Sequence, residues 1–411
     1  RIVEAVGQTL MAFDSRVAER RVFVAAEGED RLVHLLSVEH FQPHEQMEVL
    51  HRQAGDGPKQ VGFELGDNIL KRVLSKVSQV HECGDSRRKL DKLLLHQLTL
   101  VLIFLLLGRE FFGRIGGLLL ATLLAVSRWD INLSRIGMYN ISTALFALLT
   151  IGFLLRGIRR RRLSDFGLAG LSLGLGLCFY AAFQLFVIVV AAFLLALLVT
   201  HRGFFRQYWP GVVAMALMAL LVFAPVLLFA YDNPNDYFGR TRDTSLFAGK
   251  SPEQRMPALI DNTIKHLSMF NIEGDPNGRH NLPGEPMLDP ISAALMVLGL
   301  GLAFWYVREP LWLLLPVWLG VMILGGILSL DFEAPQSLRA VGTLPVAYLL
   351  AVVPLYLLWR AWMSSDGHYF PSLYAWVALA LLLPITFLNY RMYFSTWAND
   401  FASWNAFSTP E

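Results

Sequence analysis

The sequence has few cysteines and almost no excess of charge. Only two cysteines, Cys83 and Cys178, occur among its 411 residues. The first lies in a polar region and the second in an apolar one, so we expect no disulfide and no thiolate metal site. The 35 basic and 33 acidic residues give a formal net charge of +2, which does not indicate nucleic-acid binding. The first residues also lack the basic, apolar and small-residue series of a signal peptide.

Hydrophobic residues make up 55% of the chain, and its mean hydropathy is +0.46. Such a composition is typical of a polytopic membrane protein. From Leu93 onward, apolar runs alternate with short polar turns, and a helix needs roughly 20 such residues to cross the hydrocarbon layer. We therefore predict an all-α membrane protein with about ten transmembrane helices, at 93–107, 115–126, 141–155, 166–180, 183–200, 209–231, 290–307, 311–330, 341–359 and 372–388.

The arginines orient these segments. The densest basic cluster lies at 156–162, and a second lies at 201–206; both should be cytoplasmic under the positive-inside rule. Counting spans from there places residues 127–140, 232–289, 331–340 and the tail 389–411 together on the outward face. We expect a multi-pass protein of the cell (inner) membrane whose active face points outward.

The outward loop 232–289 is unusually long for a connection. Residues 252–270 carry apolar side chains at helical intervals, which predicts a helix lying along the membrane surface. The segment that follows, 270–284, is dense in turn formers and polar side chains and predicts irregular structure. A helix on the surface beside such a segment can cover a cavity.

The stretch Ser127–Asn140 is the best candidate for a site. It contains two arginines, one aspartate and two aromatic rings between apolar segments. Charges at that depth are costly unless they face an aqueous cavity or a partner. Charged residues are otherwise nearly absent from the predicted spans.

Several elements, in this order, resemble the GT-C class of membrane glycosyltransferases, and specifically the bacterial protein O-mannosyltransferases and aminoarabinose transferases of lipid A. The resemblance covers about residues 97–411 and depends on order and context more than on one motif. The matching elements are Leu107–Arg114, Ser134–Met138, Phe270–Asp289 with its Asp275-Pro276-Asn277 and Arg279-His280-Asn281, Ser337–Arg339, and the aromatic tail with Tyr393, Phe394 and Trp404.

The resemblance implies transfer of a sugar, with inversion, from a polyprenyl-phosphate-linked donor to a protein or lipid acceptor at the outer face. A lipid-phosphate donor needs cationic groups that stabilise the leaving phosphate, and arginine supplies permanently charged planar donors. Arg135 and Arg339 are our candidates. The alternative for each is an arginine at a helix end that extends to the lipid head groups.

A base must accept the proton of the incoming hydroxyl or amine. Members of the family have an additional membrane helix and an outward loop with the catalytic aspartate, both of which should precede residue 93, and residues 1–92 offer no match. They also often have an acidic residue where this chain has Tyr139 and Asn140. Asp130 is our substitute; the alternative is that it only pairs with Arg128 or Arg135. Further cavity candidates on the same face are Asp275, His280, Asp331 and Glu333.

The polar segment 1–92 is atypical for the family, and we expect it to be disordered or misjoined to a truncated enzyme. The other explanation is a natural protein that kept the membrane scaffold and lost the activity.

We expect no cofactor and no protein-bound metal; the chain has no Asp-x-Asp motif, which agrees with a lipid-phosphate donor. Competing functions are a transporter or lipid flippase, and a noncatalytic scaffold. The absence of a repeat between the two halves argues against the transporter.

Overall fold

The apolar runs fold into helices. The computed structural model describes residues 108–137, 139–364 and 371–407, all within the compact unit Ser78–Glu411. Residues 1–92 and the span predicted at 93–107 lie outside the described residues. Every span predicted from residue 115 onward coincides with a helix. These helices are Gly108–Ala125, α6 (Ser142–Arg160), α7 (Leu163–Phe179), α8 (Phe186–Thr200), α9 (Phe204–Asp232), α12 (Pro290–Trp305), α13 (Pro310–Ile327), α14 (Leu344–Ser364) and α15 (Pro371–Arg391).

Within the described ranges, six helices are long and apolar enough to cross a membrane. A seventh span results if Gly108–Ala125 and α5 (Arg128–Arg135), which are bent by 60° at their junction, count as one. The helices α7 and α12 are apolar but shorter. An all-α multi-pass membrane protein is thus confirmed. Of the nine predicted spans that lie within the described residues, six are long enough to cross a membrane as single helices.

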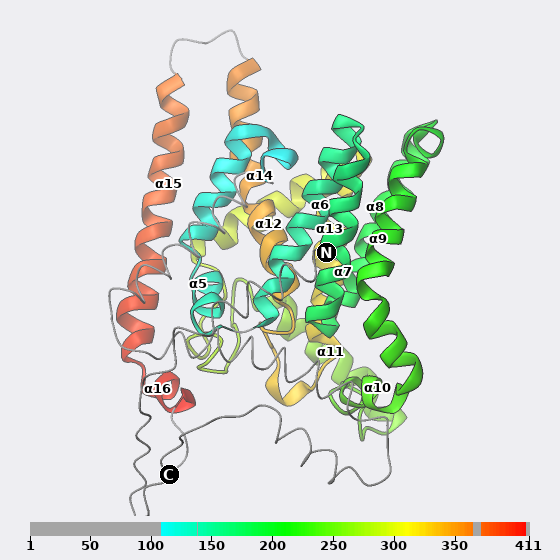
Figure 1. Ribbon diagram of the computed structural model, residues 1–411. Helices are drawn as coiled ribbons and strands as arrows, with labels where there is room; N and C mark the ends of the chain where they lie inside the picture. Colours follow the sequence, from blue (N-terminus) through cyan, green and yellow to red (C-terminus); the bar gives the residue numbers. More distant parts are fainter. Residues whose placement is uncertain (1–107, 138, 365–370, 408–411) are drawn as a thin grey trace, which may run out of the picture. The chain divides into compact units, whose positions relative to one another are not determined.

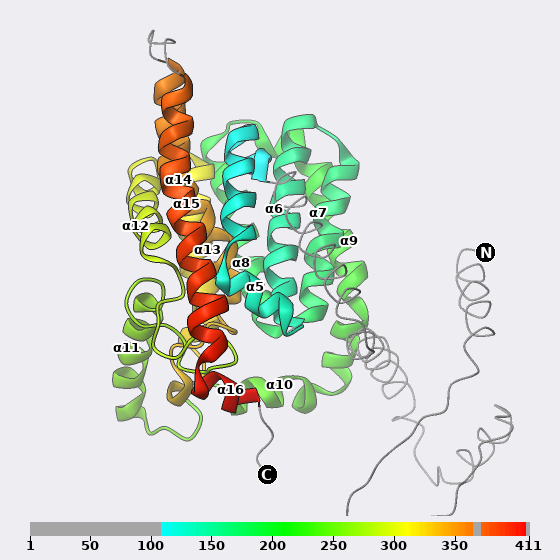
Figure 2. The same ribbon diagram turned by 90° about the vertical axis from the view of Figure 1, so that its left-hand side faces the viewer.

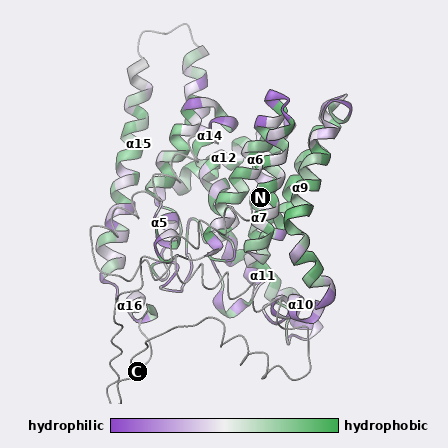
Figure 3. Ribbon diagram, in the orientation of Figure 1, coloured by the Kyte–Doolittle hydropathy of each residue, from purple (hydrophilic) through white to green (hydrophobic). Residues whose placement is uncertain are grey.

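The helices run alternately up and down (Figure 1). The helix α6 packs on α7, α7 on α9, α8 on α13, and α12 on α14. The span around α14 is the most enclosed, with 78% of its apolar window buried, whereas the spans around α9 and α15 are 11% and 17% buried. The apolar residues on these two outer helices (Figure 3) are therefore available to lipid.

Short helices and loops gather at one end of the bundle, the lower end in Figures 1 and 2. The regular pieces are α5, α10 (Pro234–Asp243), α11 (Pro252–Ser268) and α16 (Phe401–Phe407). Single turns of other helix types complete this end: η1 (Tyr139–Ile141), η2 (Ala181–Leu185), η3 (Asp331–Glu333), η4 (Val341–Thr343), η5 (Met392–Thr396) and η6 (Trp397–Asn399).

The helix predicted at 252–270 is α11. It begins at a capping box formed by Ser251 and Gln254, which satisfies backbone N–H groups of the first turn. Its polar residues Asn262 and His266 are completely buried. Its apolar stripe points away from the protein, with Met256, Ile260, Ile264 and Leu267 all more than half exposed. This arrangement agrees with a helix at the membrane surface.

Because α12 packs closely on α14, alanine substitutions at two glycines of α12 should have very different effects on stability. A Cβ atom at Gly299 would collide with the backbone of Leu350 in α14, whereas a Cβ atom at Gly301 meets nothing within 4 Å. We expect Gly299→Ala to destabilise the detergent-solubilised protein by about 1–3 kcal/mol, the usual cost of overpacking. Gly301→Ala is the matched control and should not lower the thermal unfolding midpoint. Equal midpoints for both variants would contradict the α12–α14 packing.

Candidate functional site

Four segments that are distant in sequence meet at the lower end of the bundle, and we call them the loop cluster: residues 127–140, 232–289, 331–343 and 392–407. The amide nitrogen of Asn132 lies 2.8 Å from the carbonyl oxygen of Arg279. The indole of Trp397 donates to the carbonyl of Gly278 at 3.2 Å. These contacts join α5 and the C-terminal tail to the loop between α11 and α12. The structure thus gathers the segments that sequence analysis placed on one face.

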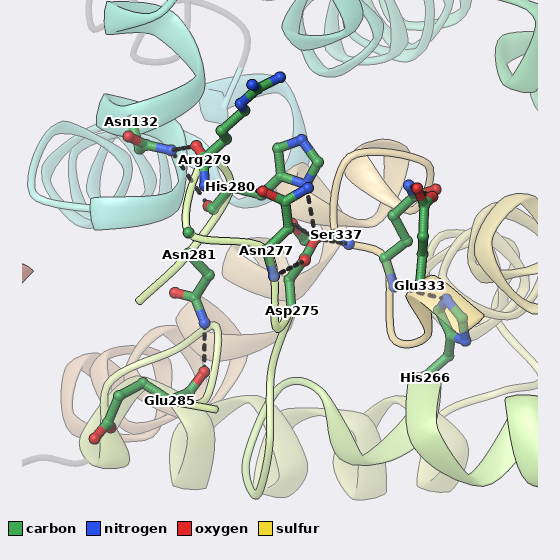
Figure 4. Close-up of polar contacts among 12 residues, drawn as sticks. Asn132, His266, Asp275, Asn277, Arg279, His280, Asn281, Glu285, Glu333 and Ser337 are labelled. Atoms are coloured by element: carbon green, nitrogen blue, oxygen red, sulfur yellow. Dashed lines mark hydrogen bonds and ion pairs between the residues drawn. The ribbon is translucent and has the colours of Figure 1, made fainter. Parts of the chain in front are cut away.

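Asp275 connects two of these segments (Figure 4). Its side chain is fully buried, and one oxygen accepts hydrogen bonds from both the backbone N–H and the hydroxyl of Ser337, each at 2.8 Å. The same oxygen accepts from Nδ1 of His280 at 3.1 Å, and the other accepts from the N–H of Asn277 at 2.9 Å. With four donors bound to it, this carboxylate is an organising group. Asp275 and His280 therefore hold the loop that leads to Arg339.

His266 supports the residue before Ser337. Its Nδ1 lies 2.8 Å from the carbonyl oxygen of Asn262, and its Nε2 accepts a hydrogen bond from the N–H of Gln336 at 3.1 Å. The proton is therefore on Nδ1, and the ring must be neutral to accept at Nε2. His266 is not among the site residues predicted from the sequence. The signal that could have found it is the polar pair Asn262 and His266, one turn apart, opposite the apolar stripe of α11.

Burial lowers the pKa of His266 from its ordinary value of 6.5, with Asp275 and Lys265 as the nearest charges acting in opposite directions. Since the unfolded chain then binds a proton more readily than the folded one, stability should be full above pH 6.5 and fall as the pH drops below it. We expect the unfolding midpoint to fall between pH 7.5 and about 5. In the variant His266→Gln, the unfolding midpoint should fall less over this pH range. In His201→Gln, a change at an exposed site, the midpoint should fall as it does in the parent. An unchanged slope in His266→Gln would contradict the assignment.

Arg339 lies in the same segment and is half-buried. Its Nη1 is 3.3 Å from the carbonyl oxygen of Thr244. Burial raises the pKa of Tyr180, and the charge of Arg339 opposes this shift, as does a hydrogen bond from Asn140. Arg339 is therefore close to Tyr180, which itself contacts the end of the 127–140 stretch.

Arg135 is exposed at the end of α5. Its Nη1 lies 3.4 Å from the hydroxyl of Tyr393, and its guanidinium is 5.9 Å from the centre of that ring. The two arginine candidates thus have different neighbours: Arg135 meets the C-terminal tail, and Arg339 meets the region of Tyr180 and Thr244. The guanidinium of Arg135 keeps most of its donors available to a ligand.

Asp130 is buried in the first turn of α5, where its backbone N–H donates to the N-cap Ser127 at 3.2 Å. Its Oδ1 atom has no hydrogen-bond partner among the described residues. Arg128 donates instead to the carbonyl oxygens of Pro286 and Leu288. Burial raises the pKa of Asp130. A carboxyl group whose pKa is raised is suited to accept a proton.

Asp331 and Glu333 have partners of their own. Asp331 lies 3.0 Å from the ammonium group of Lys250, and this hydrogen bond lowers the pKa of Asp331. Glu333 accepts a hydrogen bond from the side chain of Gln336. Both carboxylates therefore stabilise the loop that precedes Ser337. The described residues contain no group of three or more His, Cys, Asp or Glu side chains placed to hold a metal ion.

Residues 90–229 match the family model described as dolichyl-phosphate-mannose-protein mannosyltransferase. This match confirms the resemblance to the GT-C class of membrane glycosyltransferases over that part of the chain. It covers Arg109–Arg114, Asp130 and Arg135, but not Asp275 or Arg339.

A search of curated proteins found no match. Among solved structures, the chain is similar to the archaeal oligosaccharyltransferase AglB from Archaeoglobus fulgidus in complex with an inhibitory peptide and a dolichol-phosphate, with 15% identity and a TM-score of 0.43 over 70% of this chain and 43% of that one. For the apo form of the Archaeoglobus fulgidus oligosaccharyltransferase, the identity is 14% and the TM-score is 0.42, over 70% of this chain and 43% of that one. For the form tethered to an acceptor peptide with the NVT sequon, the identity is 14% and the TM-score is 0.44, over 76% of this chain and 43% of that one. The chain thus spans less than half the length of these proteins.

Proposed function

We propose that this protein transfers a sugar from a polyprenyl-phosphate-linked donor to a protein or lipid acceptor at the outward face of the cell (inner) membrane. The observation that carries this proposal is the match of residues 90–229 to a family of lipid-phosphate-sugar transferases. The loop cluster supports it, because the segments that carry Arg135, Arg339 and the buried Asp130 all lie at one end of an apolar helix bundle, although the two arginines have different neighbours there.

The chemistry assigns a role to each side chain. An acceptor oxygen or nitrogen attacks the anomeric carbon, the bond from that carbon to the phosphate oxygen breaks, and the polyprenyl phosphate leaves with both electrons of that bond. Arg135 and Arg339 stabilise the negative charge on the departing phosphate. Asp130 accepts the proton that the acceptor releases. Asp275, His280, Asp331 and Glu333 act by positioning the loops.

The transfer can be tested in proteoliposomes. Purified protein is given a polyprenyl-phosphate sugar with a radiolabel in the sugar, together with membrane proteins and lipids as acceptors. We expect label to move from the donor into one acceptor fraction, and no movement in protein-free vesicles. Movement of intact donor between leaflets without transfer would favour a flippase, and neither event would favour a scaffold. In right-side-out vesicles, protection of the loop cluster from added protease would place it on the inner side of the membrane and reject the outward assignment.

A further inference from the structure

A basic cleft lies at the end of the bundle opposite the loop cluster, the upper end in Figure 1. It has a volume of about 400 Å³ and is lined by Arg109, Glu110, Gly113, Arg114, Arg159 and Arg160. The first turns of the helix Gly108–Ala125 form one wall, and the last turn of α6 forms the other. Leu107–Arg114 is one of the elements that resemble the glycosyltransferase family, and the proposed transfer uses none of the residues that line the cleft.

Glu110 binds arginines on both walls of the cleft. Its side chain is buried, and its Oε2 accepts a hydrogen bond from Nη1 of Arg159 at 2.7 Å. The same guanidinium donates to the backbone carbonyl of Glu110, also at 2.7 Å. The Nε of Arg109 lies 3.7 Å from Glu110. One carboxylate thus holds two arginines on the two walls of the cleft.

Within the described residues, the cleft carries more positive than negative charge. Four arginines face one glutamate, and Arg114 and Arg160 have no hydrogen-bond or ion-pair partner within the part of the chain that the structure describes. By contrast, Arg156 on the same helix binds Asp165 at 2.8 Å. Like charges held together in a cleft produce a positive potential that attracts anions. A ligand with negatively charged oxygens would supply what the cleft lacks.

The position of the cleft indicates where the anion comes from. Arg109 lies in the first turn of one apolar helix and Arg160 in the last turn of another, so we infer that these side chains lie where the two helices leave the hydrocarbon layer. Leu118 and Leu163 beside them are more than half exposed, as expected for contact with lipid tails. Phosphate groups of lipids lie at this depth, and basic pockets between membrane helices bind anionic head groups.

We propose that this cleft binds the phosphate of an anionic phospholipid from the leaflet at that end of the bundle. The guanidinium groups of Arg114 and Arg160 contact the phosphate oxygens, and the Glu110–Arg159 pair shapes the wall. Arginine suits this role because its planar donors match phosphate oxygens in pairs. The acyl chains would then lie along the exposed leucines.

The test measures lipid retention by native mass spectrometry of the purified protein with added phosphatidylglycerol. In the variant Arg114→Gln/Arg160→Gln, each lost charge should weaken binding about fivefold, so the expected loss is about 25-fold. Both side chains are exposed and without partners in the described part of the chain, so the variant should fold. The matched control Arg202→Gln/Arg206→Gln removes two arginines from the same end of the bundle but outside the cleft, and should bind like the parent.

Two further additions separate the sources of the anion. Phosphatidylcholine carries phosphate without net charge and should be retained less than phosphatidylglycerol. Inorganic phosphate at equal concentration should not displace the lipid. Equal affinity of the cleft variant and the parent would overturn the proposal, as would an equal loss in the control variant or displacement by inorganic phosphate. None of these outcomes depends on sugar transfer.

Discussion

Replacing Arg339 by alanine should lower the rate of sugar transfer by about 10²–10³-fold, the usual cost of removing one group that stabilises charge in a transition state. Arg339 is half-buried and held by a loop with several hydrogen bonds, so its guanidinium is preorganised. Arg135 is exposed and has Tyr393 as its neighbour. We therefore expect a smaller loss, about tenfold, for Arg135→Ala, with much of it in the KM for the donor.

The measurement is transfer of radiolabelled sugar in proteoliposomes, with kcat and KM determined separately. Arg339→Lys keeps the charge but loses the paired donors and should recover part of the rate. Arg308→Ala changes an exposed arginine outside the loop cluster, and this control should transfer like the parent. If Arg339→Ala transfers sugar at the parental rate while its unfolding midpoint is unchanged, Arg339 has no role in catalysis.

The second large effect concerns stability. Asp275→Ala should destabilise the protein by about 3–5 kcal/mol, because it leaves buried donors without an acceptor. These donors are the N–H of Asn277, the N–H and hydroxyl of Ser337, and the ring of His280. Asp275→Asn retains one acceptor oxygen and should lose less. The measurement is thermal or denaturant unfolding in detergent.

A control comes from another aspartate in the same loop cluster. Asp261 forms an exposed ion pair with Lys265 one turn away on α11, at 2.8 Å. Exposed pairs at this spacing contribute about 0.3–0.5 kcal/mol, so Asp261→Ala should shift the unfolding midpoint little. A loss in Asp275→Ala no larger than in Asp261→Ala would refute the organising role of Asp275. Hydrogen exchange at the amides of Gln336 and Ser337 should rise in Asp275→Ala and stay unchanged in Asp261→Ala.

Local patterns in the sequence predicted the helices well. The span predicted at 290–307 corresponds to α12, which starts at Pro290 with Asp289 as its N-cap, so the start of the apolar run coincides with the start of the helix. The helix at 252–270 was equally clear from its apolar spacing. The lengths of the helices were less predictable: within the described residues, α7 and α12 are apolar but short. An apolar run shows that a helix is buried in lipid or protein, and it does not show how long the helix is.

The side-chain partners at the site could not be read from sequence. Asp275 and His280 were both candidates for the cavity, yet nothing in the sequence showed that Asp275 binds Ser337. Asp331 was a candidate as well, and its partner is Lys250. His266 was not predicted, because polar side chains opposite the apolar stripe of a helix are usually expected to face water, and here Asn262 and His266 face the protein instead. The roles of Asp130, Arg135 and Arg339 in transfer stay predictions.

By itself, the sequence determined that this is an all-α membrane protein. It also determined the order of the apolar helices and the grouping of the polar loops at one end, because hydrophobic spacing and charge bias are local properties of the chain. Only the tertiary structure decided which polar groups bind one another. Ser337 follows Asp275 by 62 residues, and Asn389 follows Asp289 by 100, yet each pair is joined by a hydrogen bond. Such contacts depend on how the helices pack across the bundle, and helix packing is set by the shapes of many side chains together.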